Sequence, residues 1–173
     1  SLFTTAPNDL ESISLTIVET LRSEFGQSNC SLLLIEPKTR ALKRLAAVGP
    51  YAKEVSSGKA LYLDGPGLAP TAAREQRIIN IGDVTQQPNY VPNWAAARSE
   101  MAIPLIVNGE VIGIIDIQSA EINAFQKDDE RLVSVFAERA ALALENTRLY
   151  DGQQQQLAFL NALHQIDLAI TGS

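Results

Sequence analysis

Apolar residues recur at helical spacing near the start of the chain, at Leu10, Ile13, Ile17, Leu21 and Phe25. Asn8 followed by Glu11 resembles a helix cap, and Gly26 is of the residue type that most often ends a helix. The pattern predicts an amphipathic first helix between these two signals.

Short apolar runs separated by turn residues predict strands through the middle of the chain. The runs lie at residues 31–36, 41–48, 60–63 and 78–81. We also expect a short helix over 68–77 and one or two helical turns over 94–98. The segment 82–92 contains two prolines and many polar residues, and it predicts a loop.

A tight hairpin is the clearest local signal. Asn108-Gly109 is the pair favoured in a two-residue type I′ turn, and apolar strands flank it over residues 99–118. This turn predicts a register with Met101 opposite Asp116. Both faces of the hairpin are apolar, which indicates a central position covered on both sides. Because proline cannot donate to a ladder, Pro104 is expected at a bulge or an unpaired position.

From Lys127 the pattern is helical for a long stretch and has two apolar stripes. One stripe fits packing against the sheet. The other is interrupted by Arg139 and Asn146, which is typical of a coiled-coil seam, and its apolar members are Leu132, Val135, Leu142 and Leu149. The periodicity continues beyond Gly152, where we expect that the helix can bend.

Composition narrows the function classes. Acidic residues outnumber basic ones by 20 to 14, and the net charge of −6 argues against nucleic-acid binding. The densest basic cluster is expected to be a solvated hairpin surface, and it comprises Lys38, Arg40, Lys43 and Arg44. One cysteine excludes an internal disulfide and a CxxC metal site, and it fits a cytoplasmic setting. No apolar run is long enough to insert directly into a membrane.

Several segments in a fixed order resemble a GAF domain over residues 8–150. They read "SLLLIEP", "GPGLAPTAAREQR", "IINIGDV", "RSEMAIPLIVNGEVIGIIDIQS" and "AFQKDDERLVSVFAERAALALENTRLY". The resemblance implies an α+β fold in which a six-stranded antiparallel sheet carries the terminal helices on one face. Loops and short helices roof the other face, with a ligand pocket beneath residues 60–100. Residues 151–173 would form a signalling helix or the start of a next domain.

The resemblance also implies a function. We expect a non-catalytic regulatory sensor of a bacterial signalling protein, such as a two-component histidine kinase or a cyclic-di-GMP enzyme. It would bind a small ligand, form a homodimer through its terminal helices, or do both. The alternative is a structural dimerisation module with a collapsed pocket and no ligand. An enzyme would need a catalytic constellation that we cannot assemble from the sequence.

No cofactor is identified for this expected function. A covalent bilin requires a thiol in the roof beside a histidine, but Cys30 begins a strand without a neighbouring histidine. Haem would need an imidazole in the core, whereas His164 is the only histidine and lies in the C-terminal segment. Members of the family that reduce free methionine sulfoxide use several cysteines, and one cysteine cannot complete that cycle.

Cyclic-nucleotide binding in the family is associated with an Asn-Lys pair followed by Phe, Asp and Glu. Phe125, Asp129 and Glu130 have that spacing here, but Gln118-Ser119 occupies the place of the Asn-Lys pair. The lysine that would pair with the aspartate is therefore missing. No zinc-ligand spacing occurs either, so we expect no metal site.

For a reversible ligand we select aromatic and charged residues of the expected roof, because apolar pockets with a few polar anchors bind small molecules. The set is Tyr62, Asp83, Tyr90, Trp94, Arg98 and Glu100. Two simpler interpretations stay open: the aromatic residues fill a closed core, and the charged ones face solvent. Asp116 is either a perturbed carboxylate or, more commonly for such a position, a strand-end aspartate bonded to backbone.

Overall fold

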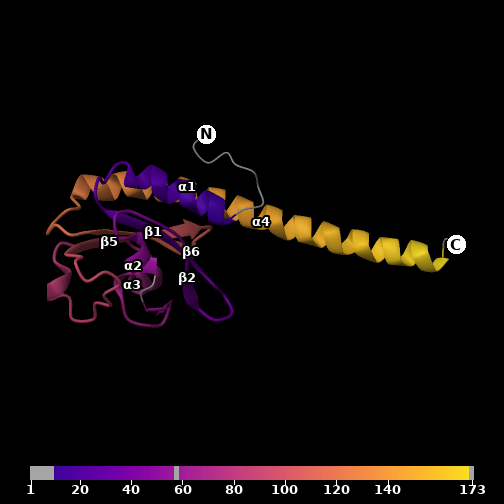
Figure 1. Cartoon of the computed structure of the whole chain (residues 1–173), viewed down its shortest axis with the longest axis horizontal. Helices are drawn as coiled ribbons and strands as arrows, with labels where there is room; N and C mark the ends of the chain where they lie inside the picture. Colours follow the sequence, from indigo (N-terminus) through magenta and orange to yellow (C-terminus); the bar gives the residue numbers. More distant parts are fainter. Residues whose placement is uncertain (1–9, 57–58, 172–173) are drawn as a thin grey trace.

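The computed structural model describes residues 10–56 and 59–171, apart from the side chains of residues 54, 56 and 166–171. Its centre is a six-stranded antiparallel sheet in the order β3-β2-β1-β6-β5-β4 (Figure 1). The strands are β1 (Asn29–Ile35), β2 (Ala41–Val48), β3 (Leu61–Tyr62), β4 (Ile79–Ile81), β5 (Ser99–Val107) and β6 (Glu110–Ser119). The expected α+β fold is confirmed.

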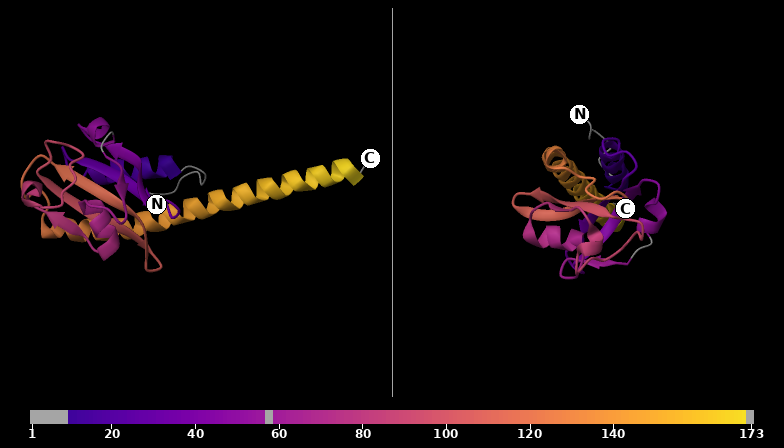
Figure 2. Two further views of the ribbon diagram at one scale, coloured as in Figure 1. Left: turned by 90° about the horizontal axis from the view of Figure 1, so that it is seen from below. Right: turned by 90° about the vertical axis from the view of Figure 1, so that its left-hand side faces the viewer.

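Two helices cover one face of the sheet, which we call the helix face. They are α1 (Leu10–Arg22) and α4 (Lys127–Thr171), and both lie on the same side of the sheet in the end-on view (Figure 2). The layer between the helices and the sheet is closed, because Ile17, Leu32 and Met101 are fully buried there. This layer is the main hydrophobic core, and it accounts for the helical spacing at the two ends of the chain.

The opposite face, which we call the roof face, is covered by short elements and loops (Figure 1). These elements are α2 (Ala52–Ser56), α3 (Leu68–Glu75) and the 3₁₀ turn η1 (Val84–Gln86). A smaller apolar layer lies beneath them, with Leu33, Ala72 and Ile114 at its centre. The β5–β6 hairpin is therefore central and covered on both sides, as its two apolar faces predict.

Local differences from the sequence-based expectations are few. Residues 94–98 form turns rather than helix. The first helix ends at Arg22, and Phe25 beyond it packs edge-on against Phe125, with ring centroids 5.7 Å apart. The expected cap at Asn8 lies outside the described residues. The long helix α4 passes through Gly152 without interruption and extends away from the domain (Figure 1). In the described part of the chain, no helix is both long and apolar enough to cross a bilayer.

The hairpin register differs from the expected one by one residue. Asn108 and Gly109 both have positive φ, 52° and 78°, as a type I′ turn requires. The pairing then shifts between Leu105 and Ile106, one residue away from Pro104, which itself stays inside the ladder. Asp116 therefore lies opposite Ala102 instead of Met101. Because side chains alternate between faces, this shift turns Asp116 from the helix face to the roof face.

Close packing at the middle of β6 gives a test of the fold. A Cβ at Gly113 would collide with the carbonyl oxygen of Leu33 and lie 2.8 Å from Leu34 Cδ2, whereas nothing lies within 4 Å of a Cβ at Gly152. We expect Gly113→Ala to reduce the free energy of unfolding by about 2 kcal/mol or more. Gly152→Ala is the matched control and should leave it unchanged or raise it by up to about 1 kcal/mol. Urea unfolding followed by circular dichroism measures both, and equal stability of the two variants would contradict this packing.

Candidate functional site

Polar side chains gather on the roof face where β1, β6 and β5 lie side by side. Residues opposite one another in an antiparallel pair share a face. Asn29, Gln118 and Glu100 therefore form one cross-strand row, and Ser31 and Asp116 lie in the next row. Strands otherwise filled with apolar residues thus carry five polar groups at one place, and we call this set together with Arg44 and Tyr90 the carboxyl cluster.

Arg44 reaches the cluster from β2 because of a second register shift. Leu32 pairs with Ala46, but Leu33 pairs with Arg44, so one residue of β2 bulges between them. Arg44 then shares the roof face with Leu33, and its Nη1 donates a hydrogen bond to Ser31 Oγ. The basic group that was expected on a solvated hairpin surface is therefore largely buried beside two carboxyls.

Both carboxyls of the cluster are buried, with Glu100 and Asp116 each 4% exposed. Burial, followed by the charge of Asp116, raises the pKa of Glu100 well above its ordinary value. Burial also raises the pKa of Asp116 to about 6, and the guanidinium of Arg44 opposes that shift. Gln118 Nε2 donates a hydrogen bond to Glu100 Oε1, which favours the ionised form of this carboxyl. The two carboxyls thus share one desolvated environment.

Tyr90 adds a hydroxyl to the cluster. Its Oη atom is buried, and burial together with Glu100 and Asp116 raises the pKa of the phenol, which therefore stays protonated. Four residues further along the chain, Trp94 is buried and stacks on Tyr51, with ring centroids 4.6 Å apart and an angle of 25° between the planes. Val55 packs with Trp94 in the same small apolar cluster. This contact joins two segments of the roof.

Several buried polar atoms have no hydrogen-bond partner among the described residues. On the roof side of the sheet they include Asn29 Nδ2, Tyr90 Oη, Asn93 Oδ1, Asp116 Oδ1 and Gln118 Oε1. Buried polar groups are normally paired, so such a concentration marks a place where a ligand or ordered water completes the bonding. Asn29 is already oriented, because its Oδ1 accepts a hydrogen bond of 3.0 Å from the backbone N–H of Tyr51.

The residues selected from the sequence are distributed unevenly. Glu100 and Tyr90 lie in the carboxyl cluster, and Trp94 is buried in the roof. Tyr62 is 51% exposed on β3, so it does not reach this place. Asp83 caps η1 by accepting from the N–H of Thr85, and Arg98 is exposed and donates to the carbonyls of Ala95 and Ala97. The structure therefore brings together two of the six.

The cluster members that the sequence did not select are Asn29, Ser31, Arg44, Asp116 and Gln118. The interpretation of Asp116 as a strand-end aspartate bonded to backbone is wrong, since Asp116 lies inside β6 and its side chain bonds to Glu100. Its Oδ1 is buried without a partner in the described structure. One signal was present in the sequence: a carboxylate inside a strand with two apolar faces has no solvent to reach. The face itself depended on the two register shifts, which the sequence did not show.

Cys30 lies on the other side of the sheet. It is 1% exposed and belongs to the core of the helix face, opposite Ile117, whereas the carboxyl cluster is on the roof face. Burial raises the pKa of its thiol well above the ordinary range, so the thiolate is disfavoured. Among the described residues, no group of three or more metal-ligating side chains is close enough to hold a metal ion.

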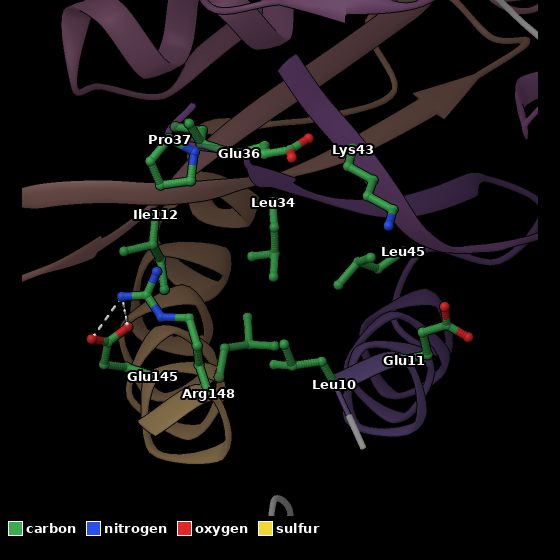
Figure 3. A pocket seen from close by; sticks show the side chains of 12 residues that line it. Leu10, Glu11, Leu34, Glu36, Pro37, Lys43, Leu45, Ile112, Glu145 and Arg148 are labelled. Carbon is green, nitrogen blue, oxygen red and sulfur yellow. Dashed lines mark hydrogen bonds and ion pairs between the residues drawn. The ribbon is translucent and has the colours of Figure 1, made fainter. Parts of the chain in front are cut away.

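An apolar groove lies at the end of the helix face between α1 and α4. Leu10, Leu34, Leu45 and Ile112 point into it, and charged side chains surround its rim (Figure 3). The groove has a volume of about 410 Å³. Arg148 and Glu145 at the rim form an ion pair of 2.7 Å, so these charges satisfy each other. The groove thus differs from the carboxyl cluster in its mainly apolar lining.

Among known protein families, residues 7–145 match the model of the GAF domain. Protein YtsP of Bacillus subtilis is 35% identical over 80 residues, which are 46% of this chain and 49% of that protein. The free methionine-R-sulfoxide reductase of Escherichia coli is 33% identical over 67 residues, 39% of this chain and 41% of that protein. The chain thus aligns with less than half the length of these curated relatives.

A solved structure with a similar fold is also a reductase. The type II free methionine-R-sulfoxide reductase of Thermoplasma acidophilum is 26% identical and superimposes with a TM-score of 0.68. The match covers 80% of this chain and 97% of that one. Similarity to a reductase therefore extends over nearly the whole domain, in fold as well as in sequence.

These relatives contradict the expectation of a non-catalytic regulatory sensor in a histidine kinase or cyclic-di-GMP enzyme. Two of them are named as reductases, and so the expectation that the domain is not an enzyme is contradicted as well. That expectation rested on histidine and multiple-thiol motifs, which are features of the linear sequence. The polar site of the fold is instead assembled across strands from carboxyl, amide and guanidinium groups, which no linear motif displays.

The raised pKa of Asp116 predicts how stability depends on pH. A carboxyl whose pKa rises from 3.8 in the unfolded chain to about 6 in the folded one binds its proton more tightly when folded. Its contribution, about 3 kcal/mol, is complete at low pH and is lost as the pH rises through 6. We expect the unliganded protein to lose stability between about pH 4 and 6.5, where only the folded chain still holds the proton, and Asp116→Asn to reduce this loss.

Urea unfolding at several pH values measures this dependence. Asp128→Asn, at an exposed position of α4, is the control and should keep the wild-type slope. A wild-type slope that is unchanged in Asp116→Asn would show that this carboxyl does not titrate in the predicted range.

Proposed function

Because the chain belongs to the GAF domain family, we propose that its carboxyl cluster binds a small ligand that carries an amino group. The ligand class is the free amino acids, with methionine sulfoxide as the first candidate because related proteins are named as reductases of it. One observation carries the proposal: the buried oxygens Asp116 Oδ1, Gln118 Oε1 and Tyr90 Oη have no partner among the described residues, and all three side chains interact with the buried carboxyl of Glu100.

The chemistry of these atoms matches an ammonium group. An ammonium has three N–H donors and one positive charge, and it accepts no hydrogen bond. The oxygens of Asp116 and Gln118 supply acceptors, and the hydroxyl of Tyr90 can accept as well. When both carboxyls are ionised, one guanidinium balances only one of their two charges. A bound ammonium would compensate the remaining charge, which is costly to bury alone.

Catalysis is a separate step from recognition. Reduction of a sulfoxide by a protein thiol requires that the sulfur reaches the ligand as a thiolate. Cys30 is the only cysteine in the sequence, and it lies on the helix face with a disfavoured thiolate. The proposal therefore concerns recognition at the carboxyl cluster, and turnover is measured as a second readout with the reductant supplied in solution.

The exposed apolar stripe on α4 supports a proposal for a protein partner that packs along this helix. The exposed apolar side chains are Leu132, Val135, Leu142 and Leu149, which are between 45% and 57% exposed and recur along one side of the helix. Val135, Leu142 and Leu149 are seven residues apart, which is the heptad spacing of a coiled coil. Asn146 falls in the neighbouring heptad row with Leu132, and an asparagine there favours two strands in register. We propose that a second copy of the chain packs along this stripe.

Titration calorimetry with L-methionine-R-sulfoxide at pH 7.5 tests the ligand proposal. We expect Glu100→Gln and Asp116→Asn each to weaken binding by at least about tenfold, because each removes a charge-assisted hydrogen bond to the ammonium. Glu110→Gln on the exposed end of β6 is the control and should bind like the wild type. A coupled assay with dithiothreitol, run in parallel, reports turnover. No binding of the sulfoxide, or binding that survives both substitutions, would overturn the proposal.

Sedimentation velocity tests the dimer. Two glutamates at the stripe, Leu142→Glu with Leu149→Glu, would bury four charges in the paired form, so the dissociation constant should rise by at least about a hundredfold. Ile122→Glu changes a side chain of similar exposure outside α4 and should leave the association as it is. A wild-type monomer at high concentration, or a dimer that resists the double substitution, would show that the stripe is not the contact.

A further inference from the structure

We propose that Arg44 and Asn29 hold the carboxylate of the ligand, so that the carboxyl cluster selects α-amino acids over amines without a carboxylate. This inference rests on the proposed function and extends it to the second charged group of the ligand. It assigns a binding role to a guanidinium on β2 and to an amide on β1, both on the roof face.

The guanidinium of Arg44 has hydrogen-bonding capacity to spare. It carries five N–H donors, and the bond from Nη1 to Ser31 Oγ uses one of them. It forms no ion pair with Glu100 or Asp116 in the described chain, although both charges act on it. A planar guanidinium that is mostly buried and not paired with a carboxylate is well suited to a bidentate contact with one.

Asn29 supplies a second donor of fixed direction. Its Oδ1 is occupied by the backbone N–H of Tyr51, so the amide cannot flip without losing that bond. Its Nδ2 is buried and has no partner within the described structure. Asn29 and Ser31 are two residues apart on one strand face, a separation of about 6.7 Å. The amide and the guanidinium therefore approach the cluster from the same side.

The donors and acceptors of the cluster are segregated. Arg44 and Asn29 lie on β2 and β1, whereas the unpaired oxygens of Gln118 and Asp116 lie on β6, directly opposite Asn29 and Ser31. An α-amino acid has its carboxylate and its ammonium on one carbon. A site with donors on one side and acceptors on the next strand fits that arrangement, whereas a simple amine would leave the donors unpaired.

Paired ligands separate this role from a purely structural one. The probes are L-methionine-R-sulfoxide and 3-(methylsulfinyl)propylamine, which is the same molecule without its carboxylate, and calorimetry measures both. We expect the wild type to prefer the amino acid by about thirtyfold or more, the range of a buried charge-assisted contact. Arg44→Met should reduce this preference to within about threefold by weakening the amino acid alone. Lys43→Met, on the same strand with an exposed side chain, should keep the preference.

Asn29→Asp gives a second test, in which the affinities for the amino acid and for the amine should respond differently. The aspartate retains an oxygen for the N–H of Tyr51 but places a negative charge where the ligand carboxylate would lie. We expect the amino acid to bind at least about tenfold more weakly and the amine to bind as well as before or more tightly. A structural defect would weaken both ligands together.

Each outcome has a defined meaning. Equal affinity of the wild type for both probes overturns the inference and leaves the proposed function standing, because the ammonium is still recognised. Parallel loss of both probes in Arg44→Met also overturns it, since Arg44 would then only support the fold. Failure of the wild type to bind either probe overturns the proposed function and the inference together.

Discussion

The pairing of three central strands, β1, β6 and β5, determines which side chains enter each of the two layers of this protein. Their backbone hydrogen bonds hold the middle of a sheet that is covered on both faces, so most side chains along them are buried on one side or the other. Two register shifts interrupt the regular pairing of the sheet, one between β5 and β6 near Ile106 and one between β1 and β2 near Leu33. A shift of one residue exchanges the faces of all residues beyond it. The shifts therefore decide which side chains meet beneath the roof.

The consequence is an electrostatic arrangement that an apolar core would not tolerate without compensation. Glu100, Asp116 and Arg44 are brought together on a face that is otherwise apolar, and their charges partly balance. Desolvation raises the pKa values of both carboxyls, and the unpaired amide and carboxylate oxygens raise the cost further. Sites where charged and unpaired polar groups are buried at a cost in folding free energy commonly bind a ligand, because the ligand supplies the missing partners.

The relatives show that this fold supports catalysis as well as binding. Reductases of free methionine sulfoxide share the fold and part of the sequence with this chain. The sheet separates the carboxyl cluster from Cys30 by placing them on opposite faces, and so the recognition of a ligand and the position of a thiol are decided by different parts of the fold. The same scaffold can retain the recognition site while the reactive groups around it vary.

The sequence by itself determined the elements, the family and the covered hairpin, because periodicity, the Asn108-Gly109 turn and the order of apolar runs are local properties. It also indicated Glu100 and Tyr90, whose residue types suit a polar anchor in an apolar roof. Only the tertiary structure decided the faces of Asp116 and Arg44. A bulge inserts one extra residue into one strand of a pair, and its position depends on how the sheet packs on both faces. The neighbouring residues in the sequence do not predict it. A site assembled from four strands therefore became visible only when their registers were known.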